Sequence, residues 1–225
     1  MKSLFLSEGK SNLLKFVGIP FGQLFTPDEL FDLKTDKGIV GKLIEKTIGL
    51  QNTSSTLDFF DGELKTNKCF RDGRPKETIF ITQISSAFDH IIGGGRFEDT
   101  TLFLKIQNML CVPVCKEGET AEWFLLPPIH VDLSRPEWSN VSNQIEQDYY
   151  FIAEQLRNHI ETSNDGFIHT SNGDLIQVRS KDGKPYNPIY SEIYGREISN
   201  KNHAFYFKKS FMNYLQELSD DYPYY

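Results

Sequence analysis

Apolar and polar positions follow a helical period near the start of the chain. Residues 37–49, "KGIVGKLIEKTIG", place five aliphatic side chains on one stripe, which predicts an amphipathic helix. Asp36 is a candidate N-cap for this helix, and Gly49 suits its C-terminal end. The earlier "TPDELF" from Thr26 has a capping residue, a proline and two acids, which predicts another helix start.

Beyond residue 57 the pattern changes to short β-branched and aromatic runs separated by turn residues. Strands are therefore expected within four segments, residues 61–66, 77–85, 108–114 and 121–126. Between them, "FDHIIGGGRFEDTT" (88–101) is expected to be a mobile loop.

The second half of the chain predicts a long helix over residues 143–160, followed by a β-hairpin over 166–180. Asn172-Gly173 marks the hairpin turn. A strand at 204–209 and a helix at 210–218 complete the pattern. Helices, a mixed sheet, a helix, strands and a helix in this order predict an α/β or α+β fold, with residues 1–225 forming a single domain.

Composition and charge narrow the classes of protein. The net charge of −7 argues against a general basic nucleic-acid coat. Residues 171–209 nevertheless carry seven basic and four acidic side chains, which suits either a nucleic-acid groove or a solvated surface.

No apolar run approaches the roughly 18 residues of a membrane span, and we expect a cytoplasmic protein. Three cysteines without a CxxC pair indicate structural thiols rather than disulfides or a zinc site.

Candidate chemistry is concentrated in residues 57–66, "LDFFDGELKT". Glu63 and Lys65 are two residues apart on an expected strand, so they project from the same face. With Asp58, they offer two carboxylates for Mg²⁺, which keeps several waters, and an ammonium group to position an attacking water. Glu45, on the preceding helix, would support this corner if that helix packs beside the strand. A simple ion pair at a strand edge is the alternative.

Six blocks in this order resemble the MutH family. They are "DKGIVGKLIEKTIG", "LDFFDGELKT", "GRPKETIF", "LKIQNMLCVPV", "LIQVRSK" and "AFYFKKSF", which span about residues 36–211. The family contains strand-nicking mismatch-repair endonucleases and related type II restriction enzymes that cut at GATC. The resemblance implies a restriction-endonuclease-like PD-(D/E)xK fold, with a mixed central sheet flanked by helices. It also implies two lobes around a DNA cleft: a catalytic lobe of about residues 1–135 and a DNA-reading lobe of about 136–225.

The resemblance also implies roles for particular residues. Asp58 and Glu63 match the metal-binding carboxylates, Lys65 the catalytic lysine, and Glu45 the helix acid that supports the site. Lys105 falls where the family has a second active-site lysine, and its alternative is a surface lysine at a strand start. The implied cofactor is Mg²⁺, with Mn²⁺ able to substitute.

DNA-contacting positions are implied in the C-terminal half. Arg179, Lys181 and Lys208 would contact double-stranded DNA, and Tyr206 matches an aromatic residue that senses adenine methylation. Hairpin-end charges and an ordinary strand tyrosine are the alternatives.

The sequence departs from the family pattern in one informative place. The gap between Asp58 and Glu63 is shorter than is usual in the mismatch-repair members, and Asp61 lies inside it as a substitute metal ligand. Because similarity to those members is distant outside the blocks, we favour a restriction enzyme that cuts both strands, with a transient homodimer on DNA. The alternative is a methylation-directed nickase activated by a mismatch-repair ATPase. A catalytically silent DNA-binding module is a remote third.

Overall fold

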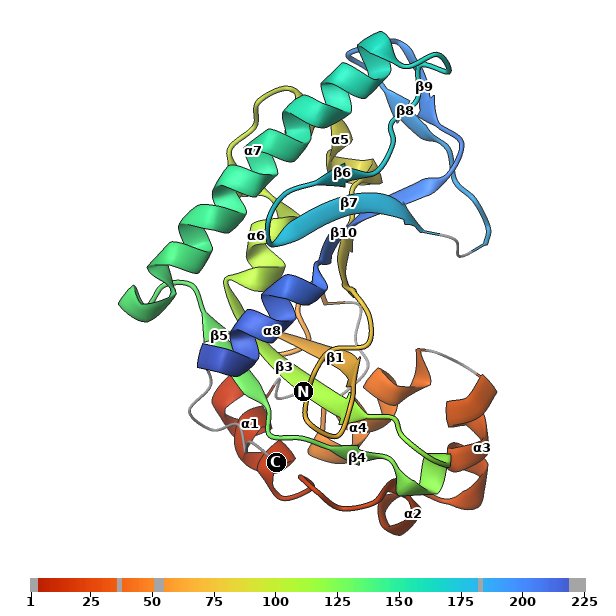
Figure 1. Ribbon diagram of the computed structural model, residues 1–225, viewed down its shortest axis with the longest axis vertical. Helices are drawn as coiled ribbons and strands as arrows, with labels where there is room; N and C mark the ends of the chain where they lie inside the picture. Colours follow the sequence, from red (N-terminus) through yellow and green to blue (C-terminus); the bar gives the residue numbers. More distant parts are fainter. Residues whose placement is uncertain (1–3, 36–37, 51–54, 182–183, 219–225) are drawn as a thin grey trace. The chain divides into compact units, whose positions relative to one another are not determined.

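The computed structural model describes residues 4–35, 38–50, 55–181 and 184–218, which fold into two compact units (Figure 1). Unit 1 comprises Met1–Ile79, Gln107–Asp132 and Met212–Tyr225, and unit 2 comprises Phe80–Ile106 and Leu133–Phe211. The chain therefore passes between the units several times.

Unit 1 contains a four-stranded mixed sheet in the described part of the chain. Its strands are β1 (Glu63–Cys69), β3 (Asn108–Cys115), β4 (Phe124–Leu125) and β5 (Ile129–Asp132). β1 runs parallel to β3, whereas β4 and β5 pair antiparallel with β3. The strands lie within or beside the expected segments, except for β5, which the sequence pattern did not reveal.

Helices cover one face of this sheet. They are α1 (Leu6–Leu14), α2 (Phe21–Leu24), α3 (Pro27–Thr35) and α4 (Ile39–Ile48). Leu64, Leu110 and Val112 from the strands belong to one buried core with Val40 and Ile44 of α4. Alternate strand residues point to one face, so this core uses the even-numbered positions of β1 and β3. The stripe predicted for residues 37–49 is confirmed.

The helix ends follow the expected local chemistry. The Thr26 hydroxyl accepts from the backbone N–H of Glu29, and the Glu29 carboxylate accepts from that of Thr26, which forms a capping box for α3. Gly49 ends α4 with φ of 87°, a left-handed conformation that favours glycine. The proposed Asp36 cap lies outside the described residues.

Unit 2 has a second four-stranded sheet in its described part, with the order β2-β10-β7-β6. These strands are β2 (Ile79–Gln83), β10 (Asn202–Phe207), β7 (Ile176–Lys181) and β6 (Ser171–Asn172). The predicted hairpin is confirmed, because Asn172 pairs with Gln177. A separate ribbon joins β8 (Ile189–Ser191) to β9 (Arg196–Ser199).

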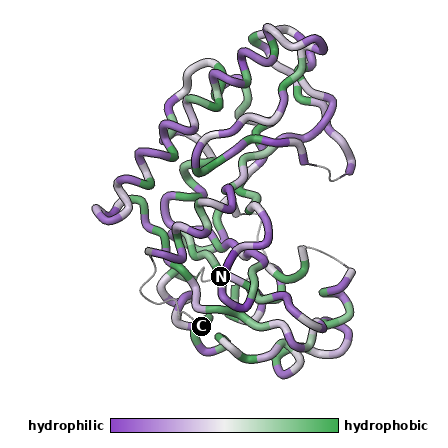
Figure 2. Tube along the Cα trace, viewed as in Figure 1, coloured by the Kyte–Doolittle hydropathy of each residue, from purple (hydrophilic) through white to green (hydrophobic). Residues whose placement is uncertain are grey.

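One long helix, α7 (Ser139–Thr162), packs on β6 and β7 (Figure 1). Hydrophobic stretches alternate with hydrophilic ones along it (Figure 2), and its buried face includes Tyr149, Ile152 and Leu156. The final helix is α8 (Lys209–Leu218). Short 3₁₀ turns are also present at η1 (Ser85–Ala87), η3 (Thr120–Glu122) and η4 (Pro136–Trp138).

The prediction of a mobile loop at residues 88–101 is wrong. The segment forms α5 (Phe88–Ile92) and η2 (Phe97–Asp99) and leads into α6 (Thr101–Ile106). Its Gly-rich centre is bound to α7: the Tyr149 hydroxyl donates to the Gly95 carbonyl, and Arg157 donates to the Ile92 carbonyl at 2.6 Å. These partners are more than 50 residues distant, so local composition did not reveal them.

The three cysteines, Cys69, Cys111 and Cys115, are free and buried, as expected for structural thiols. Burial raises the pKa of Cys69 and of Cys111 to about 12, which keeps both protonated. None of the described helices combines the length and apolar character needed to span a bilayer.

Candidate active site

A tight turn positions Asp58 at the start of β1. The backbone N–H of Leu64 donates to Asp58 Oδ2 at 2.9 Å, and that of Phe59 donates to the Gly62 carbonyl. A Cβ at Gly62 would lie 2.6 Å from the Asn108 carbonyl oxygen, so β3 approaches too closely for any side chain there. The turn is therefore fixed from both sides, and Asp58 is held beside the first residues of the strand.

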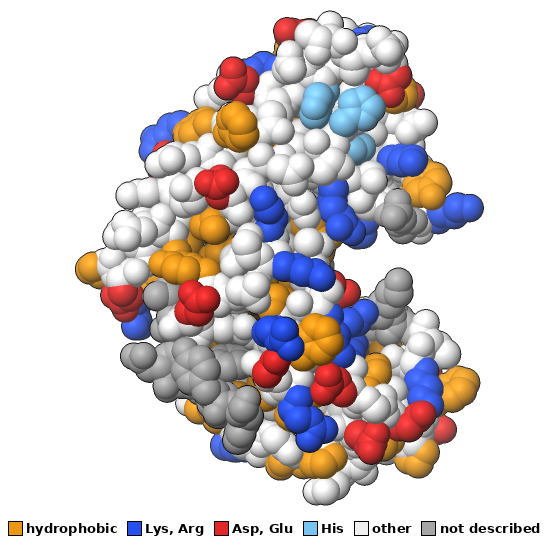
Figure 3. Space-filling model, in the orientation of Figure 1, with side chains coloured by type: hydrophobic (Ala, Val, Ile, Leu, Met, Phe, Trp, Pro, Cys, Tyr) orange, Lys and Arg blue, Asp and Glu red, His pale blue; other side chains and the backbone are white. Residues whose placement is uncertain are grey.

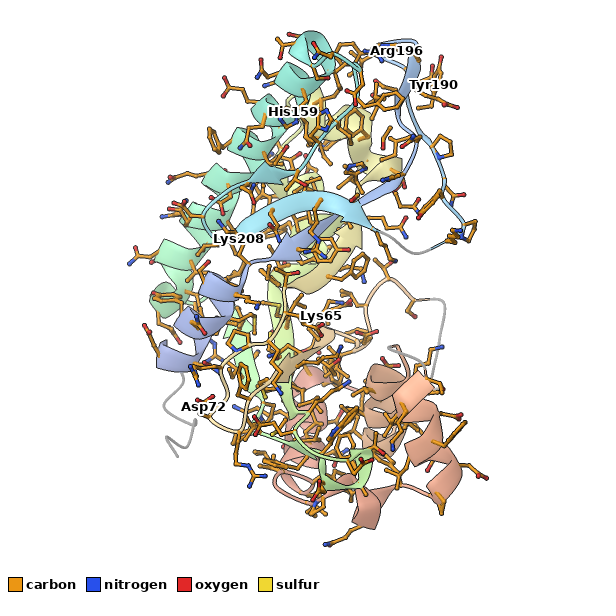
Figure 4. All side chains as sticks on the ribbon, turned by 45° about the vertical axis from the view of Figure 1, so that its right-hand side comes forward. Lys65, Asp72, His159, Tyr190, Arg196 and Lys208 are labelled. Carbon is orange, nitrogen blue, oxygen red and sulfur yellow. The ribbon has the colours of Figure 1, made fainter. Side chains whose placement is uncertain are left out.

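Glu63 and Lys65 form a largely buried ion pair on β1, where Figure 4 shows Lys65. Lys65 Nζ lies 2.5 Å from Glu63 Oε1, and their side chains are 14% and 2% exposed. The expectation that the two project from one face is confirmed. A buried ion pair of this kind is costly to break by removing one partner.

Glu45 reaches this corner from α4. Gly41, one turn before Glu45, has no side chain. Where its Cβ would be, Glu45 Oε1 lies 3.8 Å away and the Thr66 hydroxyl of β1 lies 3.9 Å away, so Glu45 faces β1. Burial raises the pKa of Glu45, and the negative charges of Asp58 and Glu63 raise it further. Three carboxylates therefore act on one another at this end of β1.

Asp61 forms a hydrogen bond outside this corner. Its Oδ1 accepts from the backbone N–H of Leu6 at 2.8 Å, at the first turn of α1, and its side chain is exposed. An aspartate there satisfies one of the free N–H groups of the helix end. Of the two aspartates, the geometry favours Asp58 as the partner of Glu63.

Lys105 lies on α6 in unit 2, rather than at a strand start. Within unit 1, the structure brings together Glu45, Asp58, Glu63 and Lys65.

In unit 2, cationic and aromatic side chains alternate on the sheet. The Arg179 guanidinium lies 4.7 Å from the Tyr206 ring centroid, and Lys181 Nζ lies 4.5 Å from that of Phe80. The Phe80 and Tyr206 rings meet edge to face at 5.7 Å. We call these four residues the cation–aromatic row. Planar rings beside cations are a common surface for nucleic-acid contact.

Phe80 was not among the sequence candidates. It stands on β2, about 100 residues before Lys181, and only sheet pairing brings it into the row. Lys208 is separate from the row. Its ammonium donates to the Gly173 carbonyl at 2.7 Å, which ties the end of β10 to the hairpin turn (Figure 4).

No family model matches the chain. Several curated proteins do, however, over most of its length. A DNA mismatch repair protein MutH from Shewanella baltica is 30% identical over 189 residues, covering 80% of this chain and 78% of that protein. The chain belongs to the MutH family. Proteins of the same name from Haemophilus ducreyi and Actinobacillus pleuropneumoniae are 28% and 26% identical, covering 83% and 91% of this chain.

Members of the MutH family are DNA endonucleases that generally use Mg²⁺. Within the described residues, no group of three or more His, Cys, Asp or Glu side chains is arranged as a metal site. Mg²⁺ needs only one or two carboxylates, because it retains several waters. Asp58 and Glu63 offer hard oxygen donors at one end of β1, and Glu45 adds negative charge beside them. The donor chemistry therefore fits this ion.

Proposed function

We propose that the protein is a Mg²⁺-dependent DNA endonuclease of restriction-endonuclease-like PD-(D/E)xK fold that cleaves at GATC or a closely related site. The observation that carries this proposal is the buried Glu63–Lys65 pair beside Asp58, with Glu45 reaching the same corner. MutH-family membership supports the substrate class and the reaction.

The residues at the start of β1 would have separate roles in cleavage. Asp58 and Glu63 would hold Mg²⁺, which when bound polarises the scissile phosphate and stabilises the leaving oxygen. Lys65 would orient the attacking water and offset negative charge that develops on the phosphate. Glu45 would support the two carboxylates from α4, where burial raises its pKa and the charges of Asp58 and Glu63 raise it further.

The cation–aromatic row would contact the duplex. Arg179 is exposed, so its guanidinium is available to phosphate or to a base edge. Tyr206 is only 8% exposed, which limits its contact to the rim of its ring or hydroxyl and suits a role in sensing a methyl group. The basic and acidic side chains on the face drawn in Figure 3 are interspersed, which agrees with a local rather than a general DNA surface. We retain a catalytic role for the N-terminal lobe and a reading role for the C-terminal lobe.

The comparisons change the order of the two functional alternatives. The sequence pattern favoured a restriction enzyme. The relatives, however, are named mismatch repair proteins, and the chain spans 78–92% of the length of the three described above. This support leads us to propose first a methylation-directed nickase that acts on the unmethylated strand of hemimethylated GATC, with a mismatch-repair ATPase as its activator.

A restriction enzyme is the second candidate, favoured by the short separation of Asp58 and Glu63. Cutting both strands of a palindrome needs either two active sites, which a transient homodimer on DNA would supply, or one active site that acts twice.

One experiment separates the two. Purified protein with Mg²⁺ is incubated with unmethylated, hemimethylated and fully methylated GATC plasmid, and the ends are mapped. A nickase leaves fully methylated plasmid intact, acts weakly alone and opens one strand. Rapid linearisation of unmethylated plasmid without any added protein would instead support the restriction enzyme. Full DNA binding without cleavage in Mg²⁺ or Mn²⁺ would contradict both and favour a silent DNA-binding module.

A further inference from the structure

A cavity of about 430 Å³ lies in unit 1, away from the residues of the candidate active site. Its charged lining comprises Lys34 near the end of α3, Lys68 on β1, Lys116 directly after β3, and Glu119. Because β1 and β3 are parallel, Lys68 and Lys116 stand at the carboxyl ends of adjacent strands. Binding sites in α/β proteins commonly occur at this edge of a sheet.

The positive charges of the lining are only partly compensated. Lys34 pairs with Glu119 at 2.6 Å, but both side chains are more than half exposed, so the pair is weak. Lys68 lies 3.4 Å from Glu77, which is itself outside the lining. The lining therefore presents three ammonium groups and one carboxylate.

Lys116 is the unusual member of this set. No ion pair of Lys116 occurs in the described part of the chain, and its ammonium lies 4.7 Å from the centroid of the Trp123 ring. Burial, and then the Lys68 charge, lower the pKa of Lys116 to about 8, and the Glu77 carboxylate offsets this only in part. A half-buried cation beside another cation has an unfavourable free energy, which a bound anion would relieve.

We propose that this cavity binds the dianion of a phosphate monoester or of inorganic phosphate. A phosphate monoester carries a charge of about −1.5 to −2 at pH 7, which complements the excess positive charge of the lining. A carboxylate or a backbone phosphodiester has only one negative charge, and lysine binds phosphate as a point charge. The volume is in the lower range of small-ligand sites. This site goes beyond the proposed endonuclease function and does not depend on it.

The test uses Trp123 as a reporter, since it lines the cavity beside Lys116. The chain has two tryptophans, and Trp138 is a buried residue of unit 2, so Trp138→Phe leaves Trp123 alone. In that protein, inorganic phosphate is titrated against Trp123 fluorescence and, in parallel, by calorimetry. We expect a saturable change at both readouts.

Lys116→Gln removes the central charge, and Lys68→Gln removes a second charge from another strand. Each should weaken phosphate binding by about tenfold or more, because a charge-assisted hydrogen bond is lost. Lys15→Gln is the matched control, an exposed lysine of the same unit away from the cavity, and should bind as the parent does. Circular dichroism confirms the fold of each variant, and retained affinity in folded Lys116→Gln and Lys68→Gln would overturn the proposal.

Further titrations identify the source of the anion. Adenosine monophosphate and an oligonucleotide with a 5′-phosphate should compete with inorganic phosphate, whereas the same oligonucleotide with a 5′-hydroxyl should not. The proposal fails if acetate or the hydroxyl-ended oligonucleotide binds as tightly as phosphate. It also fails if chloride at equal ionic strength gives the same signal, or if phosphate gives no saturable signal.

Discussion

Asp148 in unit 2 and Glu63 in unit 1 are both buried acids, with 3% and 2% exposure, but their surroundings differ. The Asp148 carboxylate accepts from the backbone N–H groups of residues 174, 175 and 176 at 2.6–3.0 Å, and from the Gln144 side chain at 3.0 Å. These neutral donors hold the hairpin turn against α7.

Glu63 instead shares its corner with other charges. Its carboxylate forms an ion pair with Lys65, and Asp58 and Glu45 contribute two further carboxylates. Crowded like charges raise the free energy of the folded state, so this arrangement is not explained by stability. The comparison teaches that burial alone does not distinguish the two acids: neutral donors surround Asp148, whereas Glu63 is buried among other charges at the start of β1.

The largest expected effect is on cleavage. Glu63→Gln keeps the shape of the side chain but removes a metal-binding charge, and the cleavage rate of GATC plasmid in Mg²⁺ should fall by more than about 100-fold. DNA affinity, measured by anisotropy, should remain. Glu77→Gln is the control, an acid of the same unit with half-exposed side chain. Cleavage equal to that of the wild type would remove Glu63 from the site.

Asp148→Ala should instead act on folding. It leaves several buried N–H groups without their acceptor, so the free energy of unfolding should fall by about 3 kcal/mol. The measurement is urea unfolding followed by circular dichroism. Asp174→Ala, an exposed acid on the same hairpin, should change stability by no more than about 0.5 kcal/mol. Similar stability of the two variants would contradict the role of Asp148.

Arg179→Ala should weaken DNA binding about tenfold, with a smaller slope of log affinity against log salt if its contact is a phosphate. The slope should fall by about one, measured by anisotropy between low and moderate salt. Lys15→Ala tests for general charge effects and should leave the slope unchanged. If both variants behave alike, the cation–aromatic row has no special part in binding.

The smallest effect should come from Glu45→Gln, measured as stability in the presence of a chelator. The pKa of Glu45 is raised in the folded protein, so the folded state binds this proton more tightly than the unfolded state does. The contribution of Glu45 to wild-type stability is therefore present below the usual glutamate pKa and is lost as pH rises through the raised one. Glu45→Gln should be more stable than the wild type at pH 7, and the difference should vanish near pH 4. A variant less stable at pH 7 would show that Glu45 makes a favourable contact instead.

Elements with strong local patterns were predictable. The stripe of α4, the N-cap at Thr26 and the hairpin at Asn172-Gly173 each depend on residues a few positions apart. The structure of segment 88–101 was not predictable, because hydrogen bonds from the distant helix α7 hold it in place. The alternative reading of Lys105 as a surface lysine at a strand start is wrong, because Lys105 lies on α6, and a boundary between helix and strand is weakly encoded by local pattern.

The same division applies to the candidate site. By itself the sequence determined that Glu63 and Lys65 share a face, because side chains of a strand repeat every two residues. Only the tertiary structure decided that Asp61 accepts a hydrogen bond from the first turn of α1. It also decided that the charges of Asp58 and Glu63 act on Glu45. Likewise, only sheet pairing places Phe80 beside Lys181. Those relations depend on how helices and strands distant in sequence pack, and local periodicity carries no information about that packing.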